Sequence, residues 1–357
     1  MNNRIPVSVL TGFLGSGKTT ALNRLLKLPE LRNTAVIINE FGEVGLDHHL
    51  ISTSEENLVL LANGCICCTV RGDLVDTFAV LTRRHAEGGG TIDRVIVETT
   101  GLADPAPILH TLMNEPAVAS HYRLQNVIAT VDAVNATRTL DKHAEAVKQV
   151  AVADRLLLTK ADLSDRAMLE ALMERLRTIN PAAPVIDVAL ALSDASVLLD
   201  GNDYDPATRT QDVREWLRLE AYEAKPDPHH HGHDDAAHVH HHDRNRHDDH
   251  IQAYAITREH PVTWAGLQGW LDMLATMRGD DLLRVKGIVN VVEHPGKPVV
   301  IHGVQHIFHP HEFLPGWPDG DERTRIVFIT RDIERDIIDE TLRIFENKRP
   351  RRPRPGD

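Results

Sequence analysis

The sequence has few cysteines, no long apolar run and no excess of positive charge, and each absence excludes a class of protein. Its three cysteines in 357 residues all fall between Cys65 and Cys68. This is a poor framework for disulfide bonds and favours metal binding or thiol chemistry. No apolar run approaches the ~20 residues that a membrane-spanning helix needs. The formal net charge of −13 argues against a nucleic-acid partner, because neutralising phosphates requires clustered Lys and Arg.

The composition that remains is typical of a soluble globular protein. Hydrophobic residues make up 42% of the chain and charged residues 25%, and a length of 357 residues suggests two domains. The run from Met1 to Pro6 leads directly into the first expected strand and leaves no room for a signal peptide. We therefore predict a cytoplasmic location without membrane association.

The N-terminal part of the chain alternates short apolar runs with helical patterns, such as the amphipathic segment Asp165–Ile179. This alternation predicts an α/β fold with a mostly parallel sheet covered on both faces. Ligands of such sheets bind outside the carboxyl ends of the strands. The expected strands are Pro6–Leu10, Thr34–Ile38, Leu58–Leu61, Ile92–Val97, Val127–Val131, Arg155–Leu158 and Val185–Val188.

A segment rich in His and Asp separates this part, 1–225, from a second one. Ten of the 22 histidines lie between His229 and His250, so we predict a disordered linker over 226–250. Beyond it, 251–347 should form a small α+β domain with helices on one face of an antiparallel sheet. The basic, Pro-rich tail 348–357 should be a disordered end. The expected elements include a short helix over Asp212–Leu219 before the linker, then Ile251–Thr257, Trp264–Met277, Leu282–Val292, Pro298–Phe308, Arg325–Thr330 and Ile333–Phe345.

The strongest motif is a phosphate-binding loop near the start of the chain. Residues Gly12 to Thr19 fit the pattern G-x-x-x-x-G-K-[ST], between an apolar strand and a helical pattern. Its glycines let the backbone wrap around an anion, and its N–H groups point at that anion. Lys18 is expected over the β- and γ-phosphates, and Thr19 on Mg²⁺. The plain alternative is a Gly-rich turn before a core helix. The loop residues assigned to the nucleotide are Gly12, Gly15, Ser16, Gly17, Lys18, Thr19 and Thr20.

Two further strand ends fit a GTP site. Thr159 to Asp162 reads T-K-x-D, where GTPases have N/T-K-x-D. The Asp162 carboxylate would accept from guanine N–H groups that adenine lacks, while Lys160 packs on the base. Thr159 in place of Asn removes one amide from this loop. Glu98 ends an apolar strand where the magnesium-side carboxylate lies in such proteins, and Gly101 gives the γ-phosphate backbone access. A merely solvated acid is the alternative for Glu98.

Between these motifs lie an acidic loop and the three cysteines. The loop from Asn39 to Asp47 occupies the place of a switch that the γ-phosphate orders. Glu40 is our candidate for orienting the attacking water or its magnesium, so the predicted catalytic residues are Lys18, Glu40 and Glu98. A plain acidic surface loop is the alternative. Thiolates select Zn²⁺, Cu(I) or a similar ion, and three of them need one more ligand for four-coordination. The expected metal ligands are Cys65, Cys67 and Cys68, completed by Glu40, Glu43 or His48.

Together, and in this order, these motifs resemble the CobW-type family of GTP-dependent metal chaperones, relatives of the GTPases that mature hydrogenase and urease. The C-x-C-C insertion between the phosphate loop and Glu98 is the most specific mark. The runs Leu283–Gly287 and Gly303–His306 resemble the small C-terminal domain of that family, so the resemblance covers nearly the whole chain. It implies slow GTP hydrolysis coupled to loading a metal, most often zinc or cobalt, onto a client protein.

We therefore predict a two-domain GTPase that delivers a transition metal to a client metalloprotein, using GTP, Mg²⁺ and Zn²⁺ or Co²⁺. One alternative is a P-loop small-molecule kinase, which would leave the cysteines idle. Another is a metal-storage protein whose nucleotide site is vestigial. The imidazoles of the linker are interpreted either as a metal reservoir, with an affinity that falls near pH ~6.5, or as part of a spacer. The client and the homo-oligomeric state stay open at this point.

Overall fold

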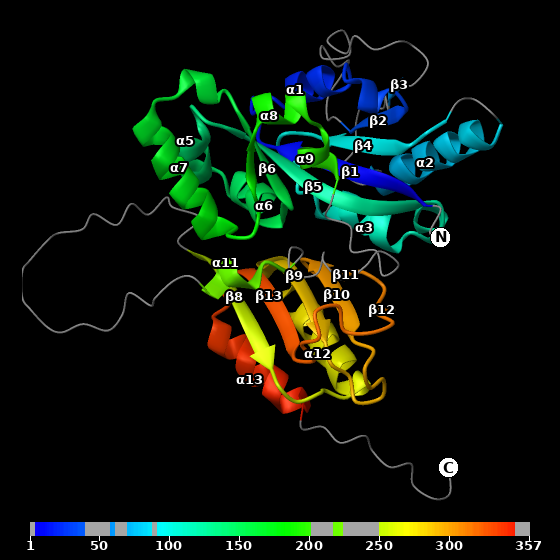
Figure 1. Ribbon diagram of the computed structural model, residues 1–357, viewed down its shortest axis with the longest axis vertical. Coiled ribbons are helices and arrows are strands. Elements are labelled where there is room, and N and C mark those ends of the chain that lie inside the picture. Colours follow the sequence, from blue (N-terminus) through cyan, green and yellow to red (C-terminus); the bar gives the residue numbers. More distant parts are fainter. Residues whose placement is uncertain are drawn as a thin grey trace, which may run out of the picture.

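The computed structural model describes residues 4–39, 58–60, 70–87, 91–200, 217–223 and 250–346. These residues build two sheets with their helices, which lie one above the other in Figure 1. The predicted His-rich linker, the basic tail and most of the predicted helix Asp212–Leu219 lie outside the described residues. None of the described helices is long and apolar enough to cross a membrane.

The first sheet has seven strands in the order β3-β2-β4-β1-β5-β6-β7, and every pairing in it is parallel. The predicted parallel sheet is thus confirmed. Its strands have these bounds: β1 (Ile5–Gly12), β2 (Thr34–Asn39), β3 (Leu58–Leu60), β4 (Arg94–Thr99), β5 (Tyr122–Asp132), β6 (Arg155–Thr159) and β7 (Val185–Asp187). β5 begins five residues earlier than the sequence pattern indicates, and Val188 starts a helix instead of ending β7.

Helices cover both faces of this sheet, because alternate strand residues point to opposite sides. Val7 and Val9 of β1 pack in one core with helices α2 and α3, whereas Leu10 packs in another with α1, α8 and α9. A third cluster joins Ala129 and Val131 to α5, α6 and α7. The helices of this part are α1 (Lys18–Leu25), α2 (Val70–Ala86), α3 (Ala106–Asn114), α4 (Pro116–Ala119), α5 (Ala136–Lys142), α6 (Ala144–Val152), α7 (Arg166–Ile179), α8 (Val188–Ser193), α9 (Ser196–Leu199) and α11 (Leu219–Glu223).

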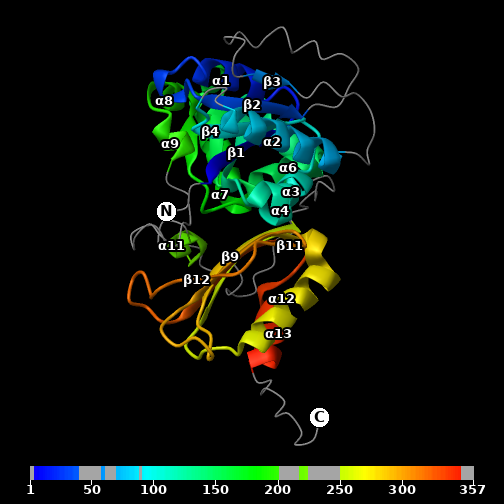
Figure 2. The same cartoon turned by 90° about the vertical axis from the view of Figure 1, so that its right-hand side faces the viewer.

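The second sheet is antiparallel, in the order β11-β10-β9-β13-β8 with β12 paired to β10. Figure 2 shows its two long helices side by side on one face, where Trp270 is fully buried. The predicted α+β architecture is therefore confirmed. The elements are β8 (Ile251–Arg258), α12 (Trp264–Arg278), β9 (Leu282–Val289), β10 (Val299–Val304), β11 (Ile307–Phe308), β12 (Glu312–Phe313), β13 (Thr324–Arg331) and α13 (Arg335–Glu346).

One end of the second sheet packs against helices of the first. Leu283 and Ile329 join the cluster that holds α6 and α7. At the centre of the junction, the buried carboxylate of Asp154 pairs with Arg284 and, at 2.8 Å, with Lys286. Burial alone would raise the pKa of Asp154, but the two cations hold that pKa well below its usual value. Burial lowers the pKa of Lys286 to about 8.

Candidate functional site

The phosphate loop connects the carboxyl end of β1 to the start of α1 at Lys18. Gly12 and Gly17 have φ angles of 138° and 89°, which residues other than glycine rarely adopt. At Gly12 a Cβ atom would also lie 2.2 Å from Thr130 Oγ1. Lys18 Nζ turns back over the loop and donates to the carbonyl oxygens of Gly12 at 2.8 Å and Phe13 at 3.2 Å. The amine thus lies over the loop, whose backbone N–H groups are suited to an anion.

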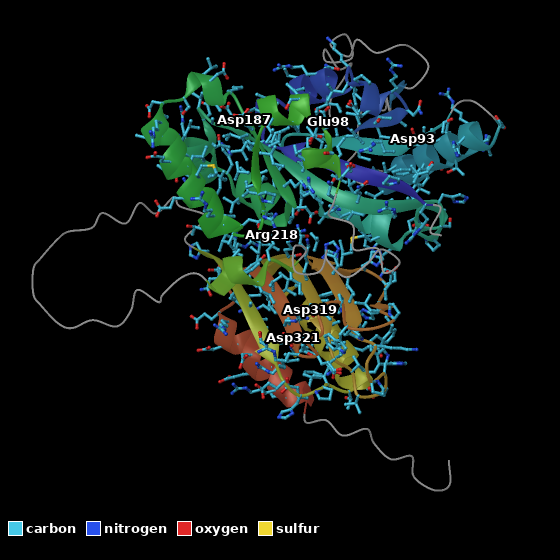
Figure 3. The ribbon with its side chains drawn as sticks, in the orientation of Figure 1. Asp93, Glu98, Asp187, Arg218, Asp319 and Asp321 are labelled. Carbon is cyan, nitrogen blue, oxygen red and sulfur yellow. The ribbon has the colours of Figure 1, made fainter. Side chains whose placement is uncertain are left out.

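Thr19 and Glu98 come from neighbouring elements and meet beside the loop. β4 pairs with β1 so that Glu98 lies opposite Leu10, and Thr19 Oγ1 donates to Glu98 Oε1 at 2.6 Å. Glu98 is only 4% exposed, so it is not the solvated strand-end acid of the plain alternative. A hydroxyl and a carboxylate oxygen this close are the hard ligands that Mg²⁺ takes in nucleotide sites, so the pair fits the ion. Figure 3 shows Glu98 within the part formed by the first sheet.

The loop after β4 lies directly against the phosphate loop. A Cβ atom on Gly101 would lie 2.7 Å from the backbone nitrogen of Leu14, so only glycine fits there. Gln149 of α6 donates from Nε2 to the carbonyl oxygens of Gly101 and Ala103, at 3.2 and 3.1 Å. Asp104, which ends this loop, accepts from Gln305 at 2.7 Å, across the junction between the two sheets. The loop therefore touches the nucleotide edge and the C-terminal part at once.

The T-K-x-D segment also packs on the phosphate loop. Lys160 has a left-handed backbone, φ 57°, and its Nζ donates to the Gly15 carbonyl at 2.9 Å and to Asp132 Oδ2 at 2.7 Å. Thr159 Oγ1 donates to the Ser16 carbonyl at 2.7 Å. The threonine hydroxyl thereby links β6 to the phosphate loop even though it lacks an amide. Asp162 lies exposed in the short 3₁₀ turn that follows.

Four elements of the predicted nucleotide site thus converge at one edge of the first sheet. They are the phosphate loop, the Thr19–Glu98 pair, Gly101 and the T-K-x-D segment. The convergence follows from parallel pairing, because β1, β4 and β6 all end at the same edge. Thr20, at the start of α1, is exposed.

The predicted metal ligands lie outside the described residues. These are Cys65, Cys67, Cys68, Glu40, Glu43 and His48. In the part of the chain that the structure describes, no group of three or more His, Cys, Asp or Glu could hold a metal ion. The flanking strands are described: β2 ends at Asn39 and β3 at Leu60, and they pair in parallel beside β4. Both therefore end at the edge that carries the phosphate loop.

Sequence reasoning missed two residues of this edge, Asp132 and Gln149. Burial alone would raise the pKa of Asp132, but hydrogen bonds from Asn135 and Lys160 hold that pKa below its usual value. Asp132 ends an apolar strand, so the rule that singled out Glu98 could have found it. Gln149 carries no such signal, because nothing in a helical pattern indicates that a glutamine contacts the carbonyl oxygens of a distant loop.

Comparisons with known proteins agree with this geometry. The model of the CobW/HypB/UreG nucleotide-binding domain matches residues 6–187, and that of the cobalamin synthesis protein CobW C-terminal domain matches 251–346. The zinc chaperone YjiA of Escherichia coli K12 is 34% identical over 327 residues, covering 92% of this chain and 94% of the relative. The chain belongs to the CobW/HypB/UreG family. The predicted P-loop NTPase fold and the assignment as a GTPase are confirmed with it.

One further relative and a solved structure of YjiA show how far the similarity extends. The zinc-regulated GTPase metalloprotein activator 1 of Saccharomyces cerevisiae is 27% identical over 387 residues, covering 95% of this chain and 83% of the relative. A crystal structure of the Zn(II)-bound YjiA GTPase from E. coli superposes with a TM-score of 0.63 at 27% identity, covering 96% of this chain and 99% of that one. The CobW-type similarity thus extends over both sheets.

Proposed function

We propose that this GTPase is a metallochaperone, which binds Zn²⁺ at its C-x-C-C motif and couples GTP binding and hydrolysis to transfer of the ion to a client metalloprotein. We propose zinc and not cobalt as the ion because the relatives named above are a zinc chaperone and a zinc-regulated activator. The observation that carries the proposal is the parallel order β3-β2-β4-β1. It makes the strands that precede the acidic loop and the cysteines end beside the strands that carry Glu98 and the phosphate loop.

At the nucleotide edge, Lys18 would leave the carbonyls of Gly12 and Phe13 and bind the β- and γ-phosphates. Thr19 and Glu98 would hold Mg²⁺, which supplies charge neutralisation to the phosphates when bound. Asp162 would read the guanine N–H groups, and Lys160, held by Asp132 and the Gly15 carbonyl, would pack on the base. Gly101 would approach the γ-phosphate through its backbone.

At the neighbouring strand ends, Cys65, Cys67 and Cys68 would hold the transferred ion. The fourth ligand would come from Glu40, Glu43 or His48, on the loop after β2. Glu40 would also orient the attacking water. Because a loop ordered by the γ-phosphate would then carry a zinc ligand, hydrolysis would weaken the site and release the ion.

We also propose limits for the domains. The GTPase domain would span 1–225, the His-rich linker 226–250, the CobW C-terminal-like domain 251–347 and the tail 348–357. The cytoplasmic location and the client protein remain predictions.

Turnover of GTP and of ATP, each with and without Zn²⁺, tests the proposal against its alternatives. A metallochaperone should hydrolyse GTP faster than ATP, change its rate with Zn²⁺, and lose one tightly bound ion in a Cys65→Ser, Cys67→Ser double variant. A kinase would turn over ATP only with an acceptor. Tight zinc binding that persists in the double variant would contradict the assignment of the cysteines.

A further inference from the structure

The turn between β10 and β11 reaches from the second sheet to the loop that follows β4. Val304 pairs with Ile307, so Gln305 and His306 form a two-residue turn between the strands. Gln305 has a left-handed backbone, φ 55°, and in hairpin turns such values favour glycine or asparagine. A glutamine therefore costs free energy here that a glycine would not. The chain tolerates this strain at a position whose side chain makes a specific contact.

The contact is with the carboxylate of Asp104. Gln305 is only 5% exposed, and its Nε2 donates to Asp104 Oδ2 at 2.7 Å. The same oxygen accepts from Lys148 Nζ on α6 at 3.2 Å, and Oδ1 accepts from the backbone N–H of Ala106, where α3 begins, at 3.0 Å. Hydrogen bonds to a charged group are stronger than those between neutral groups. The carboxylate thus joins α3 and α6 to a turn of the second sheet.

Apolar side chains of the same hairpin pack with the helix that follows this loop. Val304 and Ile307 share a core with Ile108, Leu109 and Leu112 of α3. Figures 1 and 2 both show β11 next to the part formed by the first sheet, where it contacts α3. The hairpin therefore holds both the end of the loop and the helix that continues from it.

The other end of the loop lies against the phosphate loop, where Gly101 leaves no room for a side chain beside the backbone of Leu14. Only two residues separate Gly101 from Asp104. A backbone hydrogen bond of 3.2 Å from the Ala103 N–H to the Thr100 carbonyl closes this segment into a turn. A shift of Asp104 is therefore passed on to Gly101.

We infer that Gln305 is a positioning residue for GTP hydrolysis, which acts through Asp104 on the loop that presents Gly101 to the γ-phosphate. The inference rests on the role proposed above for Gly101. The second sheet thereby sets how well the nucleotide edge binds a γ-phosphate, and by linkage a bound γ-phosphate stabilises the contact between Asp104 and Gln305. GDP has no γ-phosphate, so the contact affects GTP and leaves GDP unaffected.

Kinetics and binding of the full chain test the inference in Gln305→Gly, because glycine adopts this turn without strain and removes only the side chain. kcat/KM for GTP, from phosphate release with Mg²⁺, should fall about tenfold, and a non-hydrolysable GTP analogue should bind more weakly. The affinity for GDP by calorimetry should stay within about twofold of the parent. His306→Ala, an exposed position in the same turn, is the matched control and should leave all three values at those of the parent.

An exchange of donor and acceptor tests the contact itself. Asp104→Asn removes the charged acceptor, and Gln305→Glu places a second carboxylate beside the first, so each change alone should lower kcat/KM for GTP. Combined, they let the asparagine amide donate to the glutamate, so the double variant should exceed both single variants. Such non-additivity is expected of residues in contact.

The inference is overturned if Gln305→Gly has the same kcat/KM for GTP as the His306→Ala control. It is equally overturned if Gln305→Gly weakens GDP and the GTP analogue by one factor, which is the result of a merely structural role, or if the effects of the two exchange variants simply multiply. All these measurements are made without zinc, so the metallochaperone proposal can fail independently. The assignment of the nucleotide edge is tested separately by Lys18→Ala.

Discussion

Replacing Asp154 by Asn should uncouple the two sheets. The Asp154 carboxylate accepts from Arg284 and Lys286 and from the backbone N–H of Val127 at 2.9 Å. The side chains of the acid and of both cations are at most 7% exposed. Asparagine keeps the shape but leaves two buried cations without a counter-charge. Removing one partner of a buried pair typically costs ~3–5 kcal/mol, which is the expected loss in free energy of unfolding.

The assay is urea denaturation followed by tryptophan fluorescence, because Trp264, Trp270 and Trp317 all lie in the part formed by the second sheet. The control is Glu170→Gln, which breaks the exposed pair with Arg166 and should cost at most ~0.5 kcal/mol. A loss for Asp154→Asn as small as that of the control would refute the role given to this junction.

The lowered pKa of Asp154 should also make the stability of the fold depend on pH. Its pKa is lower in the folded chain than in the unfolded chain, where it is about 3.9. The unfolded chain therefore takes up the proton first as the pH falls. The stabilisation is fully present well above that unfolded pKa and is lost as the pH falls through it toward the folded pKa. Between pH 6 and pH 3 the parent should lose more stability than Asp154→Asn, and parallel curves for the two proteins would contradict this.

Three further predictions concern the nucleotide and metal sites. Lys18→Ala removes the cation expected over the phosphates and should abolish GTP turnover with the fold intact, so a parental rate by phosphate release would show the loop assignment to be wrong. Asp162→Asn should lower the preference for GTP over ATP by at least tenfold in competition binding, because the acceptor for guanine is lost; an unchanged ratio would place base recognition elsewhere. Deleting 226–250 should lower the number of bound zinc ions by calorimetry while leaving one tight site, and loss of that tight site would assign the functional metal to the linker.

The fold was largely predictable from the sequence because its strands are apolar runs that end in recognisable motifs. Pro6–Leu10 and Val127–Val131 were placed correctly, since buried parallel strands need continuous apolar residues on both faces. The early start of β5 at Tyr122 was missed because Arg123 and Gln125 interrupt the apolar run. Arg123 pairs with Pro6 of β1, whereas Gln125 falls at a register shift between the pairs Val7–Leu124 and Ser8–Asn126. Pairing with β1, which a local pattern does not reveal, thus holds this end of β5 in the sheet.

The positions of the candidate site residues could be predicted only where they belong to a motif, in which a given residue type with a known role recurs at a fixed spacing. Lys18 and Thr19 come after β1, Glu98 lies in the last two residues of β4 and Lys160 directly follows β6, and parallel pairing brings these strand ends together. The contact between Asp104 and Gln305 joins residues that lie 201 positions apart in the chain. This contact depends on how the two sheets pack against each other, and no local sequence motif predicts that packing.

The central claim, that the GTP state sets metal affinity, is tested most directly by zinc affinity measured with GDP and with a non-hydrolysable GTP analogue. The measurement is made in the parent and in Cys67→Ser. The account predicts that the two nucleotides change the parent's affinity by ~5–150-fold, with the same factor for the effect of zinc on nucleotide affinity, and that Cys67→Ser abolishes the difference. Equal zinc affinities of the parent in both nucleotide states would contradict it, even if zinc binds and GTP is hydrolysed.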